Sequence, residues 1–115
     1  MADRALNEAV ARAMGWTVIR GNLDTPHGPP PMQHRGAATC ERLRAYDTDP
    51  ATQAEMLAWL LQHTTGSIAI DVDDTASARC RAWGGTEEVG ATINEALARL
   101  VVAVAAKEAR REVAP

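Results

Sequence analysis

The sequence has no phenylalanine, a single tyrosine and only 20 leucine, isoleucine and valine residues among 115, whereas alanine occurs 23 times. So little large apolar volume excludes two separate cores, and we expect residues 1–115 to form one α/β domain. The net charge of -3 is too small to indicate a disordered chain. Because a thin, alanine-rich core gains stability by burying a helix face against another subunit, we also expect a homo-oligomer.

Long apolar runs and an excess of positive charge are also missing. No segment approaches the roughly 20 apolar residues that cross a bilayer, and no apolar signal-peptide core is present, so we expect a cytoplasmic protein without membrane contact. In that compartment the two cysteines, Cys40 and Cys80, should remain free thiols. With 12 basic against 15 acidic residues, a uniform basic surface for nucleic acid is not expected.

Two segments in the first half of the chain have the spacing of amphipathic helices. The first spans Ala5–Met14 and ends at Gly15, because glycine tolerates the left-handed conformation at a helix terminus. The second starts near Asp47–Pro50, where short oxygen-bearing side chains can cap free N–H groups, and it runs to about His63. Its predicted buried residues are Met56, Leu57, Leu60 and Leu61.

A third helix is predicted near the C-terminus. Thr92 and Glu95 form a capping box in front of an apolar stripe, which indicates where this helix begins. Residues 107–115 carry charge on every side of the predicted helix. We therefore expect this charged tail to be solvated.

Period-two alternation and β-branched residues predict short strands at Trp16–Arg20, Ile68–Val72 and Ala76–Trp83, with 41–46 as an additional edge strand. Residues 21–40 are rich in proline and glycine, a composition that should not hold a ladder of backbone hydrogen bonds, so we expect a long binding loop there. The predicted fold class is α+β, with three helices on a small, mainly antiparallel sheet of three to four strands.

Short segments in this order resemble the phage ABA sandwich domain family. The matching segments are Ala13–Thr17 (AMGWT), Tyr46–Asp49 (YDTD), Trp59–Leu61 (WLL), Trp83 before a glycine-containing loop, Ala91–Thr92 and Glu95–Arg99 (EALAR). The resemblance implies a helix-sheet-helix sandwich encoded by phages or prophages, and it assigns no catalytic residue. The match breaks down between Gly21 and Ala45, where a specialised function would lie.

The hairpin predicted from the last two strands has an apolar face and a charged face. If the turn between the two strands has an odd number of residues, the apolar face is formed by Ile70, Val72, Ala78 and Cys80, and the charged face is assigned on the same condition. Asp71 lies on the other face, among Arg79 and Arg81, with Trp83 at the end of the strand. Two guanidinium groups and an indole can hold a phosphate and a base, although a polar face covered by a helix or partner gives the same pattern.

A second group of basic residues, Arg42 and Arg44 beside Arg35, precedes the second helix. We regard Arg42 and Arg44, together with the arginines and tryptophan of the hairpin, as candidate ligand-binding residues. This group adds local positive charge to a chain that is acidic as a whole.

Neither a metal site nor a cofactor is predicted. His27, His34 and Cys40 recur six or seven residues apart, whereas structural zinc sites bring their ligands in close pairs. Asp71, with the aspartates that follow it, is typical of a solvated hairpin turn. We expect the loop histidines to be solvated.

The sequence does not predict an enzyme. One combination for nucleophilic catalysis can be written, Cys40 with His34 or His63 and Asp47, but its spacing matches no known arrangement. Cys80 should be buried and unreactive.

The leading hypothesis is a phage accessory protein with a counter-defence role, a sponge for a nucleotide-like small molecule or an inhibitor of a host defence protein. The alternatives are a small hydrolase that uses Cys40 and His34, or a structural component of the virion.

Overall fold

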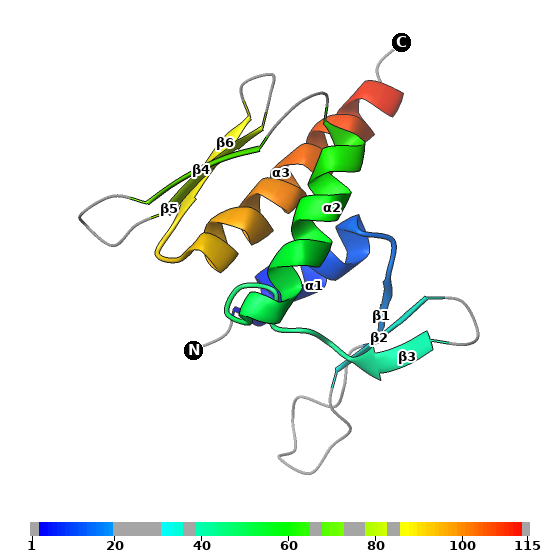
Figure 1. Ribbon diagram of the computed structural model, residues 1–115. Helices are drawn as coiled ribbons and strands as arrows, with labels where there is room; N and C mark the ends of the chain where they lie inside the picture. Colours follow the sequence, from blue (N-terminus) through cyan, green and yellow to red (C-terminus); the bar gives the residue numbers. More distant parts are fainter. Residues whose placement is uncertain are drawn as a thin grey trace.

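The computed structural model describes residues 3–19, 31–35, 39–64, 68–72, 78–82 and 86–113. These residues form an α+β structure with three α-helices and two three-stranded antiparallel sheets (Figure 1). In chain order the elements are α1 (Arg4–Ala13), β1 (Thr17–Ile19), β2 (Met32–Arg35), β3 (Thr39–Arg42), the short 3-10 helix η1 (Pro50–Thr52), α2 (Gln53–His63), β4 (Ile68–Val72), β5 (Ala78–Ala82), β6 (Glu87–Gly90) and α3 (Ile93–Val113).

The strands form two sheets, whereas one sheet of three to four strands was predicted. Sheet A has the order β1-β2-β3 and sheet B the order β4-β5-β6, all antiparallel. The α+β class with three helices is confirmed, and the single sheet is wrong.

Sheet A forms because the end of the proline-rich segment 21–40 contains a strand, β2, and is not a loop. Pro31 is the last proline before Met32, so β2 has a free N–H at every position and can pair with strands on both sides. β3 is the predicted edge strand, but it spans Thr39–Arg42 rather than 41–46. The prediction that 21–40 cannot hold a ladder is therefore wrong for β2 and for the start of β3; residues 20–30 and 36–38 lie outside the described part.

β6 was not predicted, because two glutamates and a glycine in four residues are typical of a loop. The strand pairs with β5 and ends at Gly90, against the start of α3. A Cβ atom at Gly90 would lie 2.6 Å from the backbone nitrogen of Ala96. Only glycine allows this close approach between β6 and α3.

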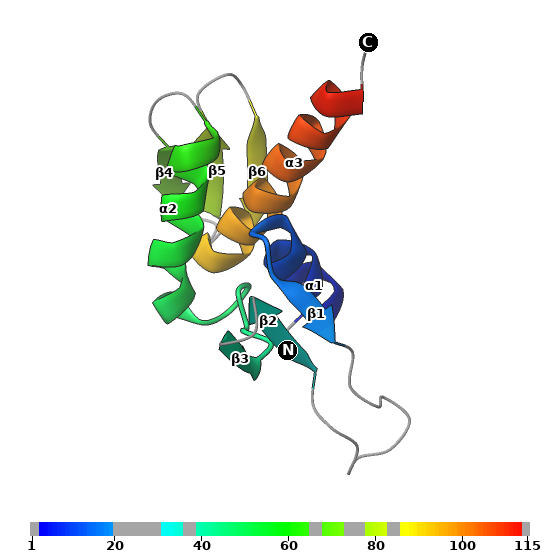
Figure 2. The same ribbon diagram turned by 90° about the vertical axis from the view of Figure 1, so that its right-hand side faces the viewer.

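The helices lie between the two sheets (Figures 1 and 2). α3 packs across β5 and β6, while α1 and α2 pack against α3 and α1 contacts β1. The small side chains of β5 allow α3 to approach sheet B closely. The largest contributions of α3 to the core are Leu97, Leu100, Val101 and Val104.

The predicted register of the β4–β5 hairpin is confirmed. Ile70 lies opposite Cys80, Val72 opposite Ala78 and Asp71 opposite Arg79. The burial of that apolar face is uneven, because Ala78 and Cys80 are buried beneath α3 whereas Ile70 is 38% and Val72 63% exposed.

The C-terminal ends of α2 and α3 differ from the prediction in two ways. Leu61 was expected in the core but is 53% exposed, because α2 buries only one narrow face; Met56 and Leu60 are fully buried, and Leu57 is half-buried. The charged tail is helical as far as Val113, and Glu108 accepts a hydrogen bond from His63 Nδ1 at 2.9 Å. None of the helices in the described ranges is long and apolar enough to cross a membrane.

Candidate binding cleft

A cleft of about 430 Å³ lies where the end of α1, one face of α2 and the strand β2 meet. Its volume falls within the range of about 300–1,000 Å³ that is usual for small-molecule sites. The residues that line it are Ala13, Met14, Gly15, Arg35, Glu55, Ala58, Trp59, Gln62 and His63.

The end of α1 positions an indole beside this cleft. Gly15 has a φ of +92°, and the Trp16 N–H then donates to the Ala11 carbonyl at 2.9 Å. A residue with a Cβ atom would be strained at this position, which explains why the helix ends on glycine. The turn directs Trp16 inward, where only 7% of the residue is exposed.

Two guanidinium groups lie over the Trp16 ring, from sheet A and from the segment that follows it. The Cζ atom of Arg35 is 4.4 Å from the ring centroid and that of Arg44 is 5.8 Å away. Both distances are within the range of a cation–π interaction. The indole Nε1 donates to the Glu55 carboxylate of α2 at 3.3 Å, so Trp16 joins sheet A to α2.

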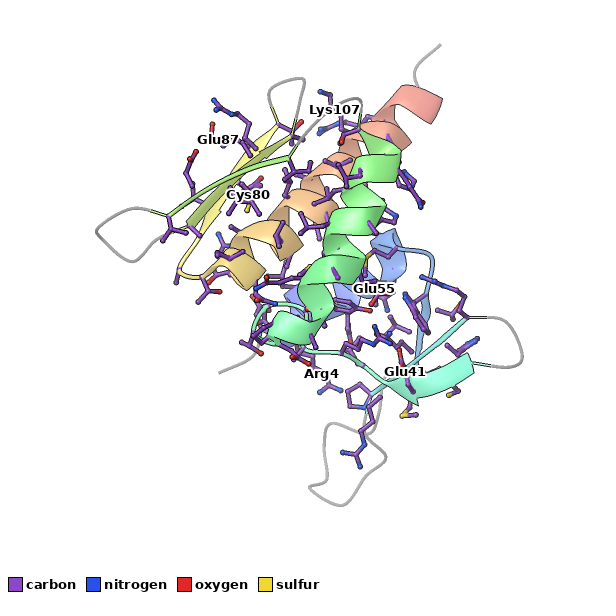
Figure 3. The ribbon with its side chains drawn as sticks, in the orientation of Figure 1. Arg4, Glu41, Glu55, Cys80, Glu87 and Lys107 are labelled. Atoms are coloured by element: carbon purple, nitrogen blue, oxygen red, sulfur yellow. The ribbon has the colours of Figure 1, made fainter. Side chains whose placement is uncertain are left out.

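Arg44 is paired with two carboxylates. Its Nε lies 2.9 Å from Glu41 Oε1, and its Nη1 forms an ion pair with Glu55. Figure 3 shows Glu41 on sheet A and Glu55 on α2 at the two sides of this contact. Burial alone would lower the pKa of Arg44, but the hydrogen bond to Glu41 and the charges of Glu55 and Glu41 outweigh it, so the pKa is raised. Arg44 therefore stabilises the fold and is not free for a ligand.

Behind Arg44, a buried chain of hydrogen bonds fixes the position of sheet A. The Tyr46 hydroxyl donates to Gln33 Oε1 at 3.1 Å, and Gln33 Nε2 donates to Glu41 Oε1 at 2.9 Å. Both Tyr46 and Gln33 are fully buried. Burial raises the pKa of Tyr46 to about 12, so the phenol stays protonated at neutral pH and keeps the proton that it donates to Gln33.

Arg35 differs from Arg44 because it lines the cleft without forming an ion pair to a carboxylate of the described chain. Its Nη2 donates to the Met14 carbonyl at 2.7 Å, which fixes one edge of the guanidinium. No acidic side chain within the described ranges forms an ion pair with Arg35, and the residue is exposed. The other edge of its planar group can therefore donate to an anion.

The opposite wall of the cleft is aromatic. The rings of Trp59 and His63 stack with centroids 4.0 Å apart and an interplanar angle of 17°. They are one helical turn apart on α2, and the hydrogen bond to Glu108 orients the imidazole. Trp59 is half-buried, so its indole presents area to the cleft.

The predicted ligand-binding residues that lie in the described part of the chain are divided between the two sheets. Arg79 and Arg81 lie on β5 of sheet B, and Trp83 is outside the described residues. Arg42 is exposed on β3 of sheet A, on the other side of the helices, and Arg44 is engaged by Glu41 and Glu55.

Cys40 and His34 are direct neighbours, which spacing alone did not indicate, because they lie opposite each other on β2 and β3. No hydrogen bond within the described part of the chain joins them, and Asp47 is buried elsewhere, where it accepts from the Asp3 N–H. His63 lies on α2. The Cys/His/Asp combination is therefore not assembled among these residues.

Two further candidates can be placed. Cys80 is buried between sheet B and the helices as expected (Figure 3), and burial raises the pKa of its thiol to about 11, which disfavours the reactive thiolate. Among the described residues, no three histidine, cysteine or acidic side chains are grouped so that they could hold a metal ion; His27 lies outside this part of the chain.

Comparison with protein-family models, with characterised proteins and with solved structures finds no match for this chain. The properties of the cleft therefore rest on its own residues.

Proposed function

We propose that this chain is a phage- or prophage-encoded accessory protein that works by binding, without catalysis, and that the cleft between α1, α2 and β2 is its ligand site. The observation that carries the proposal is Arg35, a guanidinium fixed by Trp16 and by the Met14 carbonyl but not neutralised by a carboxylate of the described chain. The ligand that fits such a group beside an aromatic wall is a small nucleotide-like anion.

Each part of that ligand has a matching group in the cleft. Arg35 offers a planar edge for bidentate hydrogen bonds to a phosphate, which a lysine could not reproduce. The stacked Trp59–His63 pair supplies an aromatic surface on which a base can stack, worth about 1–3 kcal/mol per base in comparable sites. Gln62 also lines the cleft and can donate or accept hydrogen bonds at the edge of the base, whereas the Glu55 carboxylate can only accept them.

The biological role proposed for this binding is counter-defence in the cytoplasm of a bacterial host. A protein that sequesters a nucleotide-like signal needs affinity and concentration, not turnover, and a small domain with a cleft of ligand size is sufficient for that task. The phage connection rests on the resemblance of the segments around Trp16, Trp59 and Ala91 to the ABA sandwich family.

A thermal-shift screen of cyclic and linear nucleotides tests the proposed ligand class. A bound nucleotide stabilises the folded state by about 2.7 kcal/mol when its concentration is 100 times Kd. We expect Arg35→Gln to abolish the shift, because glutamine removes both the charge and the planar guanidinium edge. Arg42→Gln, on the neighbouring strand, is the matched control and should leave the shift unchanged.

Substitution of an arginine on sheet B tests whether the ligand binds at the β4–β5 hairpin instead of the cleft. If Arg81→Gln abolishes the shift and Arg35→Gln does not, the ligand binds at the hairpin and the cleft proposal is wrong. If no nucleotide raises the melting temperature, the proposal that the protein sequesters a nucleotide is wrong, and a pull-down from a bacterial lysate then tests inhibition of a host defence protein.

Two further experiments address the alternatives. Retained activity in cells after replacement of Cys40 and His34 by alanine would exclude the hydrolase alternative. Presence of the protein in purified particles would favour a virion component.

A further inference from the structure

β4 forms an edge of sheet B, on the side next to α2 (Figure 2). In the described part of the chain it is hydrogen-bonded to β5 on one side only. Its sequence, Ile68–Val72 (IAIDV), contains neither proline nor lysine, the residues that commonly protect such an edge. The other edge, β6, carries Glu87 and Glu88. The two edges of sheet B are thus unequally protected, and β4 is the one suited to pair with another strand.

Large exposed apolar side chains gather beside this free edge. Ile70 and Val72 lie on the face of β4 that is continuous with buried Cys80 and Ala78, and α2, which carries exposed Leu61, contacts β4. Leaving these side chains in water forgoes about 25 cal/mol for each Å² of apolar surface that a partner could cover. This surface lies on sheet B, away from the cleft beside sheet A, so a partner strand at β4 is independent of the ligand proposed for the cleft.

We propose that a second copy of this chain covers this edge, with β4 pairing antiparallel to its own copy about a two-fold axis at Ile70. Ile70 then lies opposite Ile70 of the second copy, Ile68 opposite Val72, and Ala69 opposite Asp71. Every large apolar side chain of the strand meets another apolar side chain on the same face. The surface is self-complementary, as a two-fold interface requires.

The charge on β4 selects this register. If the axis passed through Asp71, the two copies of that carboxylate would lie directly opposite each other, and like charges in that position are destabilising. A slip by one residue would turn the apolar face of one copy toward the charged face of the other. The axis at Ile70 avoids both and sets Asp71 against the methyl group of Ala69.

The resulting assembly is one continuous six-stranded sheet made of two copies of sheet B. Both α2 helices lie on the same face of that sheet, one on each side of the axis, because a two-fold axis perpendicular to a sheet preserves its faces. Exposed Leu61 of each copy is on the helix nearest the axis. The dimer removes the free β4 edge and leaves the two acidic β6 edges at its ends.

Sedimentation velocity at micromolar concentration tests the interface. We expect the wild-type chain to sediment as a dimer and Val72→Lys to sediment as a monomer with an unchanged circular dichroism spectrum. The control is Val89→Lys on β6, which places the same charge at another exposed valine, across β5 on the opposite face of the sheet. A monomeric wild type, a dimeric Val72→Lys, or equal disruption by Val89→Lys would overturn the proposal.

Cysteine cross-linking tests the register separately. In a Cys40→Ser, Cys80→Ala background, which also removes the thiol opposite position 70 on β5, Ile70→Cys places the two new thiols opposite each other at the axis, where an added oxidant that accepts two electrons and two protons can join them. We expect a disulfide-linked dimer on a non-reducing gel for Ile70→Cys and none for Val89→Cys. A wild-type dimer that Ile70→Cys does not cross-link, or that Val89→Cys cross-links equally, would contradict pairing about Ile70.

Discussion

At the scale of single residues, burial gives two identical side chains opposite properties. Cys40 is exposed on β3, whereas Cys80 is fully buried between β5 and the helices. Burial, and to a smaller degree the charge of Asp71, raises the pKa of Cys80 to about 11. Since the thiolate is the reactive form, Cys80 should react slowly in the folded state for two reasons: reagents cannot reach it, and its thiol stays protonated.

We therefore expect one thiol per chain to react rapidly with an aromatic disulfide reagent at mildly alkaline pH, and the second only after unfolding. Unfolding exposes Cys80 and returns its pKa from about 11 toward the ordinary value of 9.0, so the thiolate fraction rises. Absorbance during the reaction, with and without urea, measures both phases. Cys40→Ser should remove the rapid phase alone; a rapid phase that survives in this variant would mean that Cys80 is accessible.

The central residues of the cleft were not predictable from local sequence. Arg35 and Trp16 are separated by a stretch rich in proline and glycine, and they meet only because β2 pairs with β1. The ion pairs of Arg44 could not be predicted from local sequence either. Arg44 was predicted as a ligand-binding residue, but it is paired with Glu41 and Glu55. Sequence alone could indicate where arginines cluster, but the strand pairing decides which one is unpaired.

At the scale of elements, one asparagine ties the start of α3 to the start of α2. Asn94 is 4% exposed, and its Nδ2 lies within hydrogen-bond distance of the Tyr46 carbonyl (3.1 Å), the Asp49 carbonyl (2.6 Å) and Thr52 Oγ1 (3.2 Å). Its Oδ1 accepts from Gln53 Nε2 at 2.6 Å. The turn before α2 thus depends on a side chain more than 40 residues away.

We expect Asn94→Ala to lower the free energy of unfolding by about 2–3 kcal/mol, because it leaves buried acceptors with fewer donors. Gln53→Ala is the matched control, since it removes one hydrogen bond of the same group and should cost about 1 kcal/mol or less. Urea denaturation monitored by tryptophan fluorescence measures both. If Gln53→Ala costs as much as Asn94→Ala, the asparagine does not hold the two helices in the way described.

The elements that the sequence predicted are those with a strong periodic pattern. α1, α2 and α3, β1, β4 and β5 lie close to where the spacing placed them. Half of the capping box is confirmed, since Glu95 N–H donates to Thr92 Oγ1 at 3.1 Å, whereas the Glu95 carboxylate accepts from the Ala91 N–H at 3.2 Å. β2 and β6 were missed because each has four residues of mostly polar or charged type, and pairing rather than composition stabilises them. Sheet A as a separate unit could not be foreseen without β2.

At the scale of the whole molecule, the three helices separate two small sheets to which we assign different tasks. Sheet A, through Arg35, borders the cleft, while sheet B supports α3 and presents the free edge of β4. A thin core is sufficient for this arrangement, because alanine and cysteine on β5 allow α3 to pack closely. Binding and assembly then use surfaces on opposite sides of the helices and can be disturbed independently.

The central claim, that the cleft binds a nucleotide-like anion and does no chemistry on it, is tested most directly by calorimetric titration and subsequent recovery of the ligand. The nucleotide with the largest thermal shift should bind saturably, at one site per chain, and return chemically unchanged after prolonged incubation with the protein. Arg35→Gln should show no binding heat under the same conditions. A recovered product that wild type forms and Arg35→Gln does not, or undiminished binding by Arg35→Gln, would contradict the claim.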